Sequence, residues 1–372
     1  MLYAGFGKAD MTPESSVQLG GYEKREGVSQ NIHLPVFSRT MILKWHNEFF
    51  VLISLELLGI DLAFAHTLRE EISQLLPVEK KHIFIGATHT HSSYEGFPAH
   101  LHKGLWLEEP RMDIEIRKRI KEKVVLSIKD AQNNLQKASM FKGTGKGRLG
   151  GNRRKKGGIF DNQILLLQFI SEEGVRIGSL VNYSCHPTVL DHTNLNISGD
   201  YAGWIMKEME ADGGINLFFN GAAGDISTRF QRDKATPLEV ERLGGILLHD
   251  IKQIQCEEVA IHTIKAQEKE ITLEQKNGRK ITSLLQVLRL GILTLVFFPG
   301  ELFTGEGLQL KKFNRELFII GYANDYIGYI LTDQAYKEEG YEVEVTRFEQ
   351  KEKNFLMEEV RKMVEPGDLA FK

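Results

Sequence analysis

Short apolar runs alternate with amphipathic stretches along most of this 372-residue chain, and this alternation constrains its fold more than any other feature. Apolar, strand-like runs occupy residues 39–45 and 48–55, and residues 61–76 then repeat apolar side chains at helical spacing. The other strand-like segments are residues 82–87, 164–170, 175–183, 215–219, 285–298 and 317–322, and the other helical ones are residues 112–135, 201–209 and 237–254. Strands interleaved with helices predict an α/β fold, a layered domain with a mixed β-sheet core flanked by helices. Because the sequence has no internal repeat and no long linker, we expect residues 1–372 to form a single domain.

The composition and the N-terminus exclude several classes of protein. The 47 basic and 50 acidic residues give a formal net charge of −3, so no nucleic-acid partner is expected. The cysteines, Cys185 and Cys256, are too few for a disulfide framework, which favours a reducing compartment. The N-terminus lacks the pattern of a signal peptide, and the most apolar stretch, residues 49–60, is interrupted by Glu56 and too short to cross a bilayer. We therefore expect a cytoplasmic protein without a transmembrane segment, while the sequence leaves its oligomeric state open.

One segment, residues 142–158, is rich in glycine and basic residues. Its Gly-Thr-Gly-Lys-Gly looks like a phosphate-binding loop. However, Met140 stands where that motif requires its first glycine, and Gly147 stands where it requires Ser or Thr. We therefore expect a mobile, solvated loop.

Two histidines follow the strand predicted at residues 82–87, in the run Thr-His-Thr-His-Ser. In an extended backbone, side chains two residues apart face the same side, so His89 and His91 can address one point. Neutral imidazole is the commonest nitrogen ligand of zinc. Surface or hydrogen-bonded histidines would give the same pattern, so both interpretations stay open at this point.

Cys185 and His186 follow the strand predicted at residues 175–183 and precede Pro187. An adjacent cysteine and histidine suggest a thiol nucleophile, but neighbours on a strand point to opposite faces and do not pair easily. The sequence therefore favours Cys185 as a small buried side chain and His186 as a functional residue.

Three further polar segments follow predicted strands, at residues 220–227, 298–301 and 324–329. The first is a glycine-rich loop that lets the backbone approach a ligand, the second carries Glu301, and the third carries two tyrosines. Taken singly, the first segment is equally compatible with an ordinary loop, the second with a solvated glutamate in a turn, and the third with aromatic side chains that serve packing. The ends of buried strands are nevertheless where α/β proteins usually place their sites.

Taken together and in order, these segments resemble the signature blocks of the neutral ceramidase family, from about Gly5 to Tyr341. The matching blocks are Ala-Asp-Met-Thr at residues 9–12, Gly-Gly-Tyr at 20–22, the strand at 32–39, Thr-His-Thr-His-Ser at 88–92, Ile-Ser-Gly-Asp at 197–200, Gly-Asp-Ile-Ser at 224–227, Pro-Gly-Glu at 299–301 and Asn-Asp-Tyr-Ile-Gly-Tyr at 324–329. The resemblance implies the ceramidase-like catalytic domain as the fold, without the C-terminal immunoglobulin-like domain of the secreted enzymes.

The same resemblance implies a zinc-dependent amidohydrolase that cleaves an N-acyl bond with a metal-activated water. The positions that match the family's metal ligands are His89, His186, Glu301 and Tyr329, a donor set that suits Zn²⁺. Those that match residues with a catalytic role are His91, Arg153, Ser227 and, again, Tyr329. Ser227 matches a serine that has been argued to be a nucleophile, a role that a metal-activated water does not require.

The implied mechanism assigns a task to most of these groups. Zinc lowers the pKa of a water and polarises the amide carbonyl. Arg153 or Tyr329 then helps to hold the oxyanion, and His91 protonates the departing amine. Asp200 and Asp225 are expected to orient the ligand histidines.

The chain departs from the family pattern at positions that contact substrate. Residues 92–96 read Ser-Ser-Tyr-Glu-Gly in place of Ser-Gly-Pro-Gly-Gly, Thr228-Arg229 replaces Pro-Asn, and Arg154-Lys155-Lys156 follows Arg153. The expected partner is a small-molecule N-acyl substrate, with a sphingolipid such as ceramide as the first candidate. The alternatives are a soluble N-acyl sugar, amino acid or peptide as the substrate, and a non-catalytic binding module that kept the fold.

Overall fold

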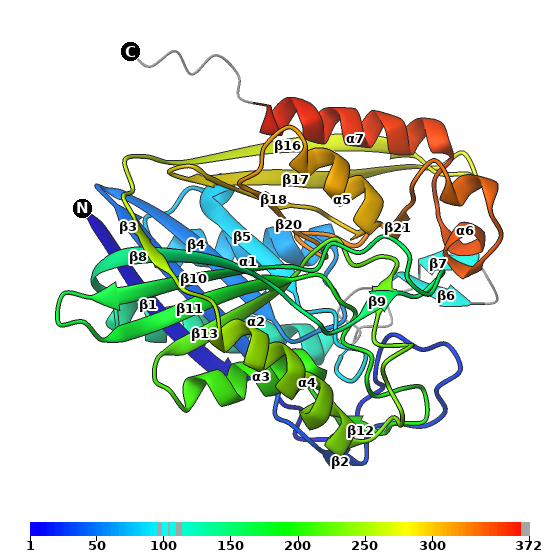
Figure 1. Cartoon of the computed structure of the whole chain (residues 1–372), viewed down its shortest axis with the longest axis horizontal. Coiled ribbons are helices and arrows are strands. Elements are labelled where there is room, and N and C mark those ends of the chain that lie inside the picture. The colour runs from blue at the N-terminus through cyan, green and yellow to red at the C-terminus, as the bar shows by residue number, and fades with distance from the viewer. Residues whose placement is uncertain (95–98, 103–104, 109–113, 366–372) are drawn as a thin grey trace.

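The computed structural model describes residues 1–94, 99–102, 105–108 and 114–365. Its elements are arranged in four layers: helices, a large sheet, a smaller sheet and again helices (Figure 1). The predicted α/β architecture with a mixed sheet flanked by helices is therefore confirmed, and the second sheet is an addition to it.

The large sheet has nine strands within the described residues, in the order β13-β11-β10-β8-β1-β3-β4-β5, with β15 pairing with β8. Their bounds are β1 Leu2–Asp10, β3 Phe37–Trp45, β4 Glu48–Leu55, β5 Ile83–Ala87, β8 Gln136–Lys146, β10 Gln163–Ser171, β11 Arg176–Tyr183, β13 Ile215–Asn220 and β15 Glu257–Val259. The pairs β4–β5 and β11–β13 are parallel and the others are antiparallel. The sheet is therefore mixed, as the sequence predicts.

The smaller sheet runs β16-β17-β18-β20, and its last two strands are parallel. Its strands are β16 Ile264–Glu274, β17 Lys280–Leu290, β18 Leu293–Phe297 and β20 Leu317–Ile320. Shorter strands form pairs elsewhere: β2 Asn31–Ile32 with β12 Asn196–Ile197, β9 Gly151–Asn152 with β14 Ile226–Ser227, β19 Glu301–Leu302 with β21 Tyr329–Ile330, and β6 Ala99–His102 with β7 Leu105–Glu108.

Helices cover the two outer faces. The large sheet carries α1 Leu62–Leu75, α2 Ile114–Asn133, α3 Asp200–Glu210 and α4 Pro237–Lys252, and the smaller sheet carries α5 Thr304–Lys311 and α7 Gln350–Val364. The other helical turns are α6 Tyr341–Val345 and the 3₁₀ turns Lys80–His82 and Ala335–Lys337. Within the described part of the chain, none of the helices combines the length and the apolar character needed to span a bilayer.

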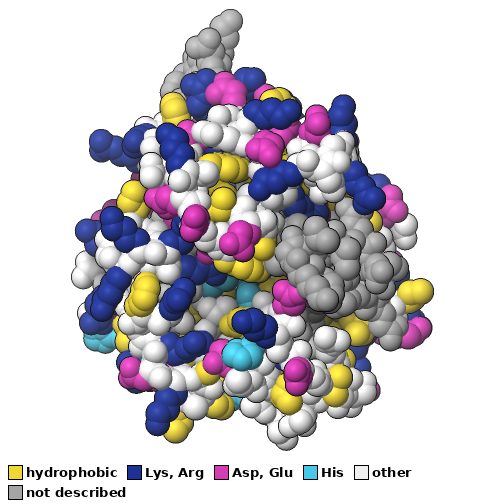
Figure 2. Space-filling view, turned by 90° about the vertical axis from the view of Figure 1, so that its right-hand side faces the viewer, with side chains coloured by type: hydrophobic (Ala, Val, Ile, Leu, Met, Phe, Trp, Pro, Cys, Tyr) yellow, Lys and Arg dark blue, Asp and Glu magenta, His cyan; other side chains and the backbone are white. Residues whose placement is uncertain are grey.

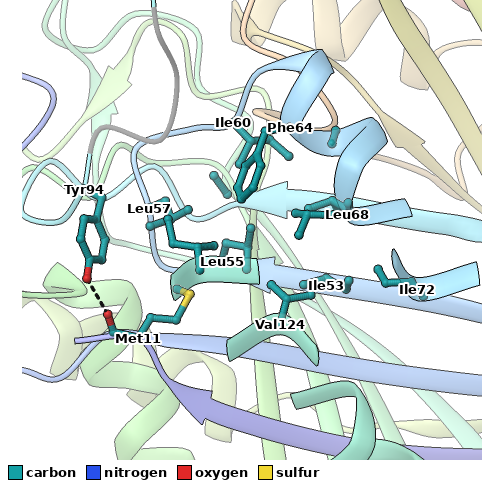
Figure 3. Close-up of a cluster of buried hydrophobic side chains, with 14 of the residues drawn as sticks. Met11, Ile53, Leu55, Leu57, Ile60, Phe64, Leu68, Ile72, Tyr94 and Val124 are labelled. Carbon is teal, nitrogen blue, oxygen red and sulfur yellow. Dashed lines mark hydrogen bonds between the residues drawn. The ribbon is translucent and has the colours of Figure 1, made fainter. Parts of the chain in front are cut away.

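Alternation along the strands explains the layers. In β4, Ile53 and Leu55 face the helices, whereas Phe50 and Leu52 face the smaller sheet, because successive side chains of a strand point to opposite faces. Figure 3 shows the helix-side cluster, in which Ile53 and Leu55 lie among side chains from α1 and α2. Both faces of β4, in the middle of the molecule, are therefore buried.

The structure corrects two of the sequence-based expectations. The solvated loop expected at residues 142–158 is interrupted by strands: residues 142–146 are the end of β8 and residues 151–152 are β9, whereas residues 147–150 and 153–158 lie outside helices and strands. The glycines of β8 make room for Ile254: a Cβ on Gly143 would lie 2.4 Å from its Cγ2 atom. Residues 285–298 form parts of two strands rather than one, which turn at Gly291 with a φ of 58°.

The two sheets meet at the carboxyl ends of their parallel strands. The Ala87 N–H donates to the Tyr322 carbonyl at 3.0 Å, and the Asn324 N–H donates to the Ile85 carbonyl at 2.8 Å. A third bond joins the Gly321 N–H to the Asn220 carbonyl at 2.9 Å. These bonds bring together the loops that carry the polar clusters found in the sequence.

Candidate metal centre

Buried polar side chains converge where these loops meet. His89 and His91 follow β5, His186 follows β11, and Glu301 follows β18 after three residues. The side-chain nitrogens of the three histidines lie within 4.8 Å of one another, so they form a group that could hold a metal ion. Figure 2 shows histidine side chains at the bottom of a hollow on the face at the right of Figure 1, with lysine and arginine side chains around it.

Main-chain carbonyls fix two of the imidazole rings. The Nδ1 atom of His89 lies 2.6 Å from the Leu58 carbonyl oxygen, and that of His186 lies 2.7 Å from the Ala223 carbonyl oxygen. A ring nitrogen beside a carbonyl oxygen must carry the proton, since the oxygen can only accept. The Nε2 atoms of both rings are therefore left with free lone pairs, the form in which imidazole binds metal.

The protonation states agree with this assignment. Burial lowers the pKa of His89 and of His186 to about 3, with the nearby Arg153 adding to the effect. Both imidazoles are therefore neutral at physiological pH.

A carboxylate lies against these lone pairs. The Oε2 atom of Glu301 is 3.0 Å from Nε2 of His186 and 3.7 Å from Nε2 of His89, and Glu301 is 1% exposed. Two lone-pair atoms that face each other at 3.0 Å in a buried site repel unless a cation or a proton lies between them. A divalent cation fits this donor set, and mixed nitrogen and oxygen ligands suit Zn²⁺.

Two tyrosines complete the surroundings of Glu301. The short parallel pair of β19 and β21 places Tyr329 beside Glu301, and the two side chains are hydrogen-bonded. Tyr326 donates its hydroxyl to the Oε1 atom of Glu301. Burial raises the pKa of Tyr329 far above its ordinary value, and Arg153 opposes that rise. In the absence of a metal, Tyr329 is therefore a protonated phenol.

Arg153 is held at the edge of this group by several contacts. Its Nη2 atom donates to the Tyr329 hydroxyl at 3.1 Å and to the Gly224 carbonyl at 2.8 Å, and its Nε donates to Glu342 at 2.8 Å. The pairing of β9 with β14 brings the Arg153 segment beside residues 224–227. Position 224 has no room for a side chain, because a Cβ on Gly224 would lie 2.5 Å from the Glu301 carbonyl oxygen.

His91 lies between the histidine pair and the N-terminal segment. Its Nε2 atom is 3.2 Å from Nε2 of His89, and its Nδ1 atom is buried without a hydrogen-bond partner among the described residues. Gly21, at a φ of 92°, packs directly on the ring, since a Cβ there would lie 2.4 Å from Nδ1. Arg25 donates to the His91 carbonyl at 2.7 Å. The predicted Gly-Gly-Tyr block thus serves to position His91.

Ser227 and Cys185 lie next to the centre but are not activated. The Ser227 hydroxyl accepts from the Arg229 N–H at 3.3 Å, and no imidazole within the described residues is hydrogen-bonded to it. The Cys185 thiol contacts the His186 carbonyl oxygen at 3.7 Å, and burial raises the pKa of that thiol. The geometry therefore offers neither side chain the neighbouring base that a nucleophile needs.

The expectation that Asp200 and Asp225 orient the histidines is wrong. The Asp200 carboxylate accepts from the N–H groups of Val189 and Leu190, at 3.3 and 3.0 Å. The carboxylate of Asp225 accepts from the Asn152 side chain and from the Thr304 N–H, both at 2.8 Å. Both carboxylates therefore fix loops around the site, and carbonyl oxygens orient the rings.

Tyr322 and Tyr326 contribute to the site although the sequence assigned them no role. The Tyr322 ring stacks on His89 with centroids 3.9 Å apart, and both residues have a left-handed backbone, with φ values of 56° and 68°. Non-glycine residues rarely adopt that conformation, and such strain concentrates at functional sites. The three-residue spacing of Tyr326 and Tyr329 was a signal in the sequence that could have indicated a role for Tyr326. No sequence pattern indicates that Tyr322 stacks on His89. Glu95 and Gly96, part of an expected departure, lie outside the described residues.

Fold and site together define an α/β protein with a buried imidazole–carboxylate centre at the ends of its strands. Residues 2–229 match the family described as "Neutral/alkaline non-lysosomal ceramidase, N-terminal". The chain belongs to this family.

Individual relatives agree with the family. The chain is similar to the neutral ceramidase of Pseudomonas aeruginosa, at 26% identity over an alignment of 247 residues; the match covers 60% of this chain and 36% of that protein. The crystal structure of neutral ceramidase from Pseudomonas aeruginosa superposes with a TM-score of 0.84 at 19% identity, over 98% of this chain and 75% of that one. A structure titled "Ceramidase complexed with C2" gives 0.80 at 18% identity, over 98% and 76%. At such identities, the two structures establish the shared fold.

Proposed function

We propose that this protein is a zinc-dependent hydrolase that cleaves an amide bond of an N-acyl substrate, with ceramide as the first candidate. The main observation behind the proposal is that two neutral imidazoles, those of His89 and His186, both face the buried carboxylate of Glu301. The family supports the ceramide class, because the relatives are named for that activity.

His89, His186 and Glu301 would hold the metal, with Tyr329 as the fourth donor. When bound, zinc supplies a more acidic water and a polarised amide carbonyl. The protein residues around it supply the remaining steps.

His91 is the proposed carrier of the proton. Burial lowers its pKa well below the ordinary value, so its imidazole is neutral before reaction and can accept a proton at Nε2. It takes the proton that the attacking water loses and passes it to the departing amine nitrogen. The sum of these steps is RCONHR′ + H₂O → RCOO⁻ + R′NH₃⁺. This route modifies the expectation that His91 acts only as the acid.

Arg153 stabilises the negative charge that develops on the carbonyl oxygen. Its guanidinium is fixed by Glu342 and Gly224 before substrate arrives, so little reorganisation is needed during reaction. The Tyr329 hydroxyl, which accepts from Arg153, lies at the same edge. A serine nucleophile is not required, and Ser227 has no base beside it within the described residues.

The decisive assay compares zinc-loaded protein, chelator-treated protein and re-loaded protein on short-chain ceramide, an N-acyl amino acid and an N-acyl sugar. We expect cleavage of ceramide that is lost with the metal and restored with zinc. A soluble compound cleaved in its place would support the alternative substrate class. A metal-free protein that cleaves ceramide equally well would contradict the proposal, and a loaded protein that cleaves nothing would favour a binding module.

The cellular setting is also proposed. The two cysteines are free, which fits the reducing cytoplasm. A single domain over residues 1–372 likewise stays a prediction.

A further inference from the structure

A cavity of about 310 Å³ lies next to residues that contact the candidate metal centre. Arg153 lines it and reaches the centre through its hydrogen bond to the Tyr329 hydroxyl. Tyr341 lines it as well, with its ring centroid 6.1 Å from that of Tyr329. These two contacts link the cavity to the centre, so a group of the substrate beyond its amide is the candidate occupant of the cavity.

Two of the cations that line the cavity are already neutralised. Arg153 pairs with Glu342 at 2.8 Å, and Arg154 pairs with Glu342 at 2.8 Å and with Glu338 at 3.1 Å. Because Glu342 is 5% exposed and holds both guanidinium groups, these pairs form the structural wall of the cavity. They are not available to a ligand without breaking buried ion pairs.

Two further cations line the same cavity, Lys155 and Arg229. Neither has an ion pair within 4 Å of a carboxylate among the residues that the structure describes; Arg229 lies over the ring of Phe230 at 5.7 Å. One more carboxylate, that of Glu339, also lines the cavity and is exposed. The lining thus has four cationic and three anionic side chains, which gives the cavity a net positive charge. The cations without an ion pair among the described residues are Lys155 and Arg229.

The segments that carry these two side chains are joined by the antiparallel β9–β14 pair. Lys155 donates its N–H to the Asn152 side chain just after β9, and Arg229 donates its N–H to the Ser227 hydroxyl just after β14. Because the pair is antiparallel, the two turns lie at its opposite ends, and both side chains line the cavity. Lys155 and Arg229 are also positions at which the chain departs from the family pattern.

We propose that this cavity binds an anionic group on the amine half of the substrate, held by Lys155 and Arg229. The inference rests on the proposed amide hydrolysis and narrows its substrate class to N-acyl compounds with a phosphate, sulfate or carboxylate near the amide nitrogen. A guanidinium and an ammonium suit such a group, because charge-assisted hydrogen bonds to oxyanions are the strong ones.

The test uses three substrates with the full-length, zinc-loaded protein: short-chain ceramide, its 1-phosphate, and an N-acyl amino acid of equal acyl length. We expect kcat/KM for at least one anionic substrate to exceed that for neutral ceramide about tenfold, mainly through KM. Which of them is preferred distinguishes a lipid phosphate from an amino-acid carboxylate. The preference should weaken as salt is raised, since the cavity is open to solvent.

Three variants make the test specific to the cavity. Arg229→Gln and Lys155→Gln should each reduce the preference for the anionic substrate about tenfold. Lys156→Gln, the same change in a neighbouring exposed lysine that does not line the cavity, should leave the preference within about twofold. Ceramide cleaved as well as both anionic compounds, with an unaltered ratio in both cavity variants, would overturn the inference and leave the proposed hydrolysis intact.

A failure of the proposed function gives a different result. If the zinc-loaded protein cleaves none of the three substrates, the affinity for ceramide 1-phosphate measured by calorimetry still tests the anion site. Binding that is lost in Arg229→Gln supports the anion site, whereas equal binding to wild type and to both cavity variants contradicts it.

Discussion

The imidazoles of His89 and His186 owe their orientation to main-chain oxygens. Each Nδ1–H donates to a carbonyl of a neighbouring loop, Leu58 in one case and Ala223 in the other. A carbonyl cannot exchange its role with pH, so the metal-binding tautomer is fixed whatever the charge of nearby carboxylates. At the scale of single residues, the site therefore depends on loop geometry and on packing against the rings.

Tyr322 supplies that packing for His89, so its flat ring should matter more than its hydroxyl. The hydroxyl is buried without a hydrogen-bond partner within the described residues. We expect Tyr322→Leu to weaken zinc affinity about 10- to 100-fold, as loss of an orienting partner does, and Tyr322→Phe to change it less than about twofold. Competition with a zinc chelator measures both. Equal affinities in the two variants would remove Tyr322 from a positioning role.

Arg153 should not be replaceable by lysine. A lysine keeps the charge but cannot contact Glu342, Gly224 and Tyr329 together, as the guanidinium does. We expect Arg153→Lys to lower kcat about 100-fold while bound zinc stays stoichiometric. The matched change Arg148→Lys, at an exposed arginine that pairs with Asp250 far from the described contacts of Arg153, should leave kcat near wild type. A normal kcat in Arg153→Lys would show that the carbonyl oxygen is stabilised elsewhere.

At the scale of elements, α3 and the loop after His186 are joined by the Asp200 carboxylate. Burial raises the pKa of Asp200 from 3.8 to about 6, against the lowering effect of backbone N–H groups such as that of Leu190. The folded state thus binds this proton more tightly than the unfolded state does. The stability that the group contributes is complete below pH 3.8 and is lost as the pH rises through about 6.

Asp200→Asn isolates this dependence. The free energy of unfolding of the wild type, relative to that of the variant, should fall by about 2 kcal/mol between about pH 4 and about pH 7. Urea unfolding at several pH values measures the difference. Because asparagine offers only one acceptor oxygen, the variant is expected to be less stable throughout, and only the change with pH is informative. Parallel pH profiles would contradict the raised pKa.

The sequence predicted most elements well and failed where glycine had an unusual role. The helix predicted at residues 61–76 is α1, Leu62–Leu75, because its apolar periodicity is unbroken and Asp61 caps it at Phe64. The glycine-rich end of β8, residues 142–146, was mistaken for part of a loop, since its glycines allow close packing on Ile254, a contact distant in sequence. The hydrogen-bond partners of the ligand histidines were predicted to be Asp200 and Asp225, because main-chain carbonyl oxygens cannot be recognised from the pattern of side chains.

At the scale of the whole molecule, the site exists because two sheets are held together at one end. Phe297 of the smaller sheet packs between Phe84 and Phe219 of the large one, with ring centroids 4.6 and 6.1 Å apart. The histidines extend from the large sheet, whereas Glu301 extends from the smaller sheet. The donor set is therefore complete only while the inter-sheet core is intact.

Truncation of that core should destabilise the fold. Phe297 is fully buried, so we expect Phe297→Ala to lower the free energy of unfolding by about 3–5 kcal/mol. Phe355→Ala, on the exposed face of α7 at 46% exposure, should cost less than about 1 kcal/mol. Chemical denaturation compares the two. Similar losses in both variants would mean that the inter-sheet contact is not the main constraint.

The central claim, that His89, His186 and Glu301 bind one metal ion, is tested most directly by elemental analysis of purified protein. We predict about one zinc per chain in the wild type and in the control His192→Ala, which changes an exposed histidine. In His186→Ala and in Glu301→Gln, we predict that nearly all of the bound zinc is lost. Circular dichroism establishes that the variants are folded. One zinc per chain retained in folded His186→Ala and Glu301→Gln would contradict the metal centre described above.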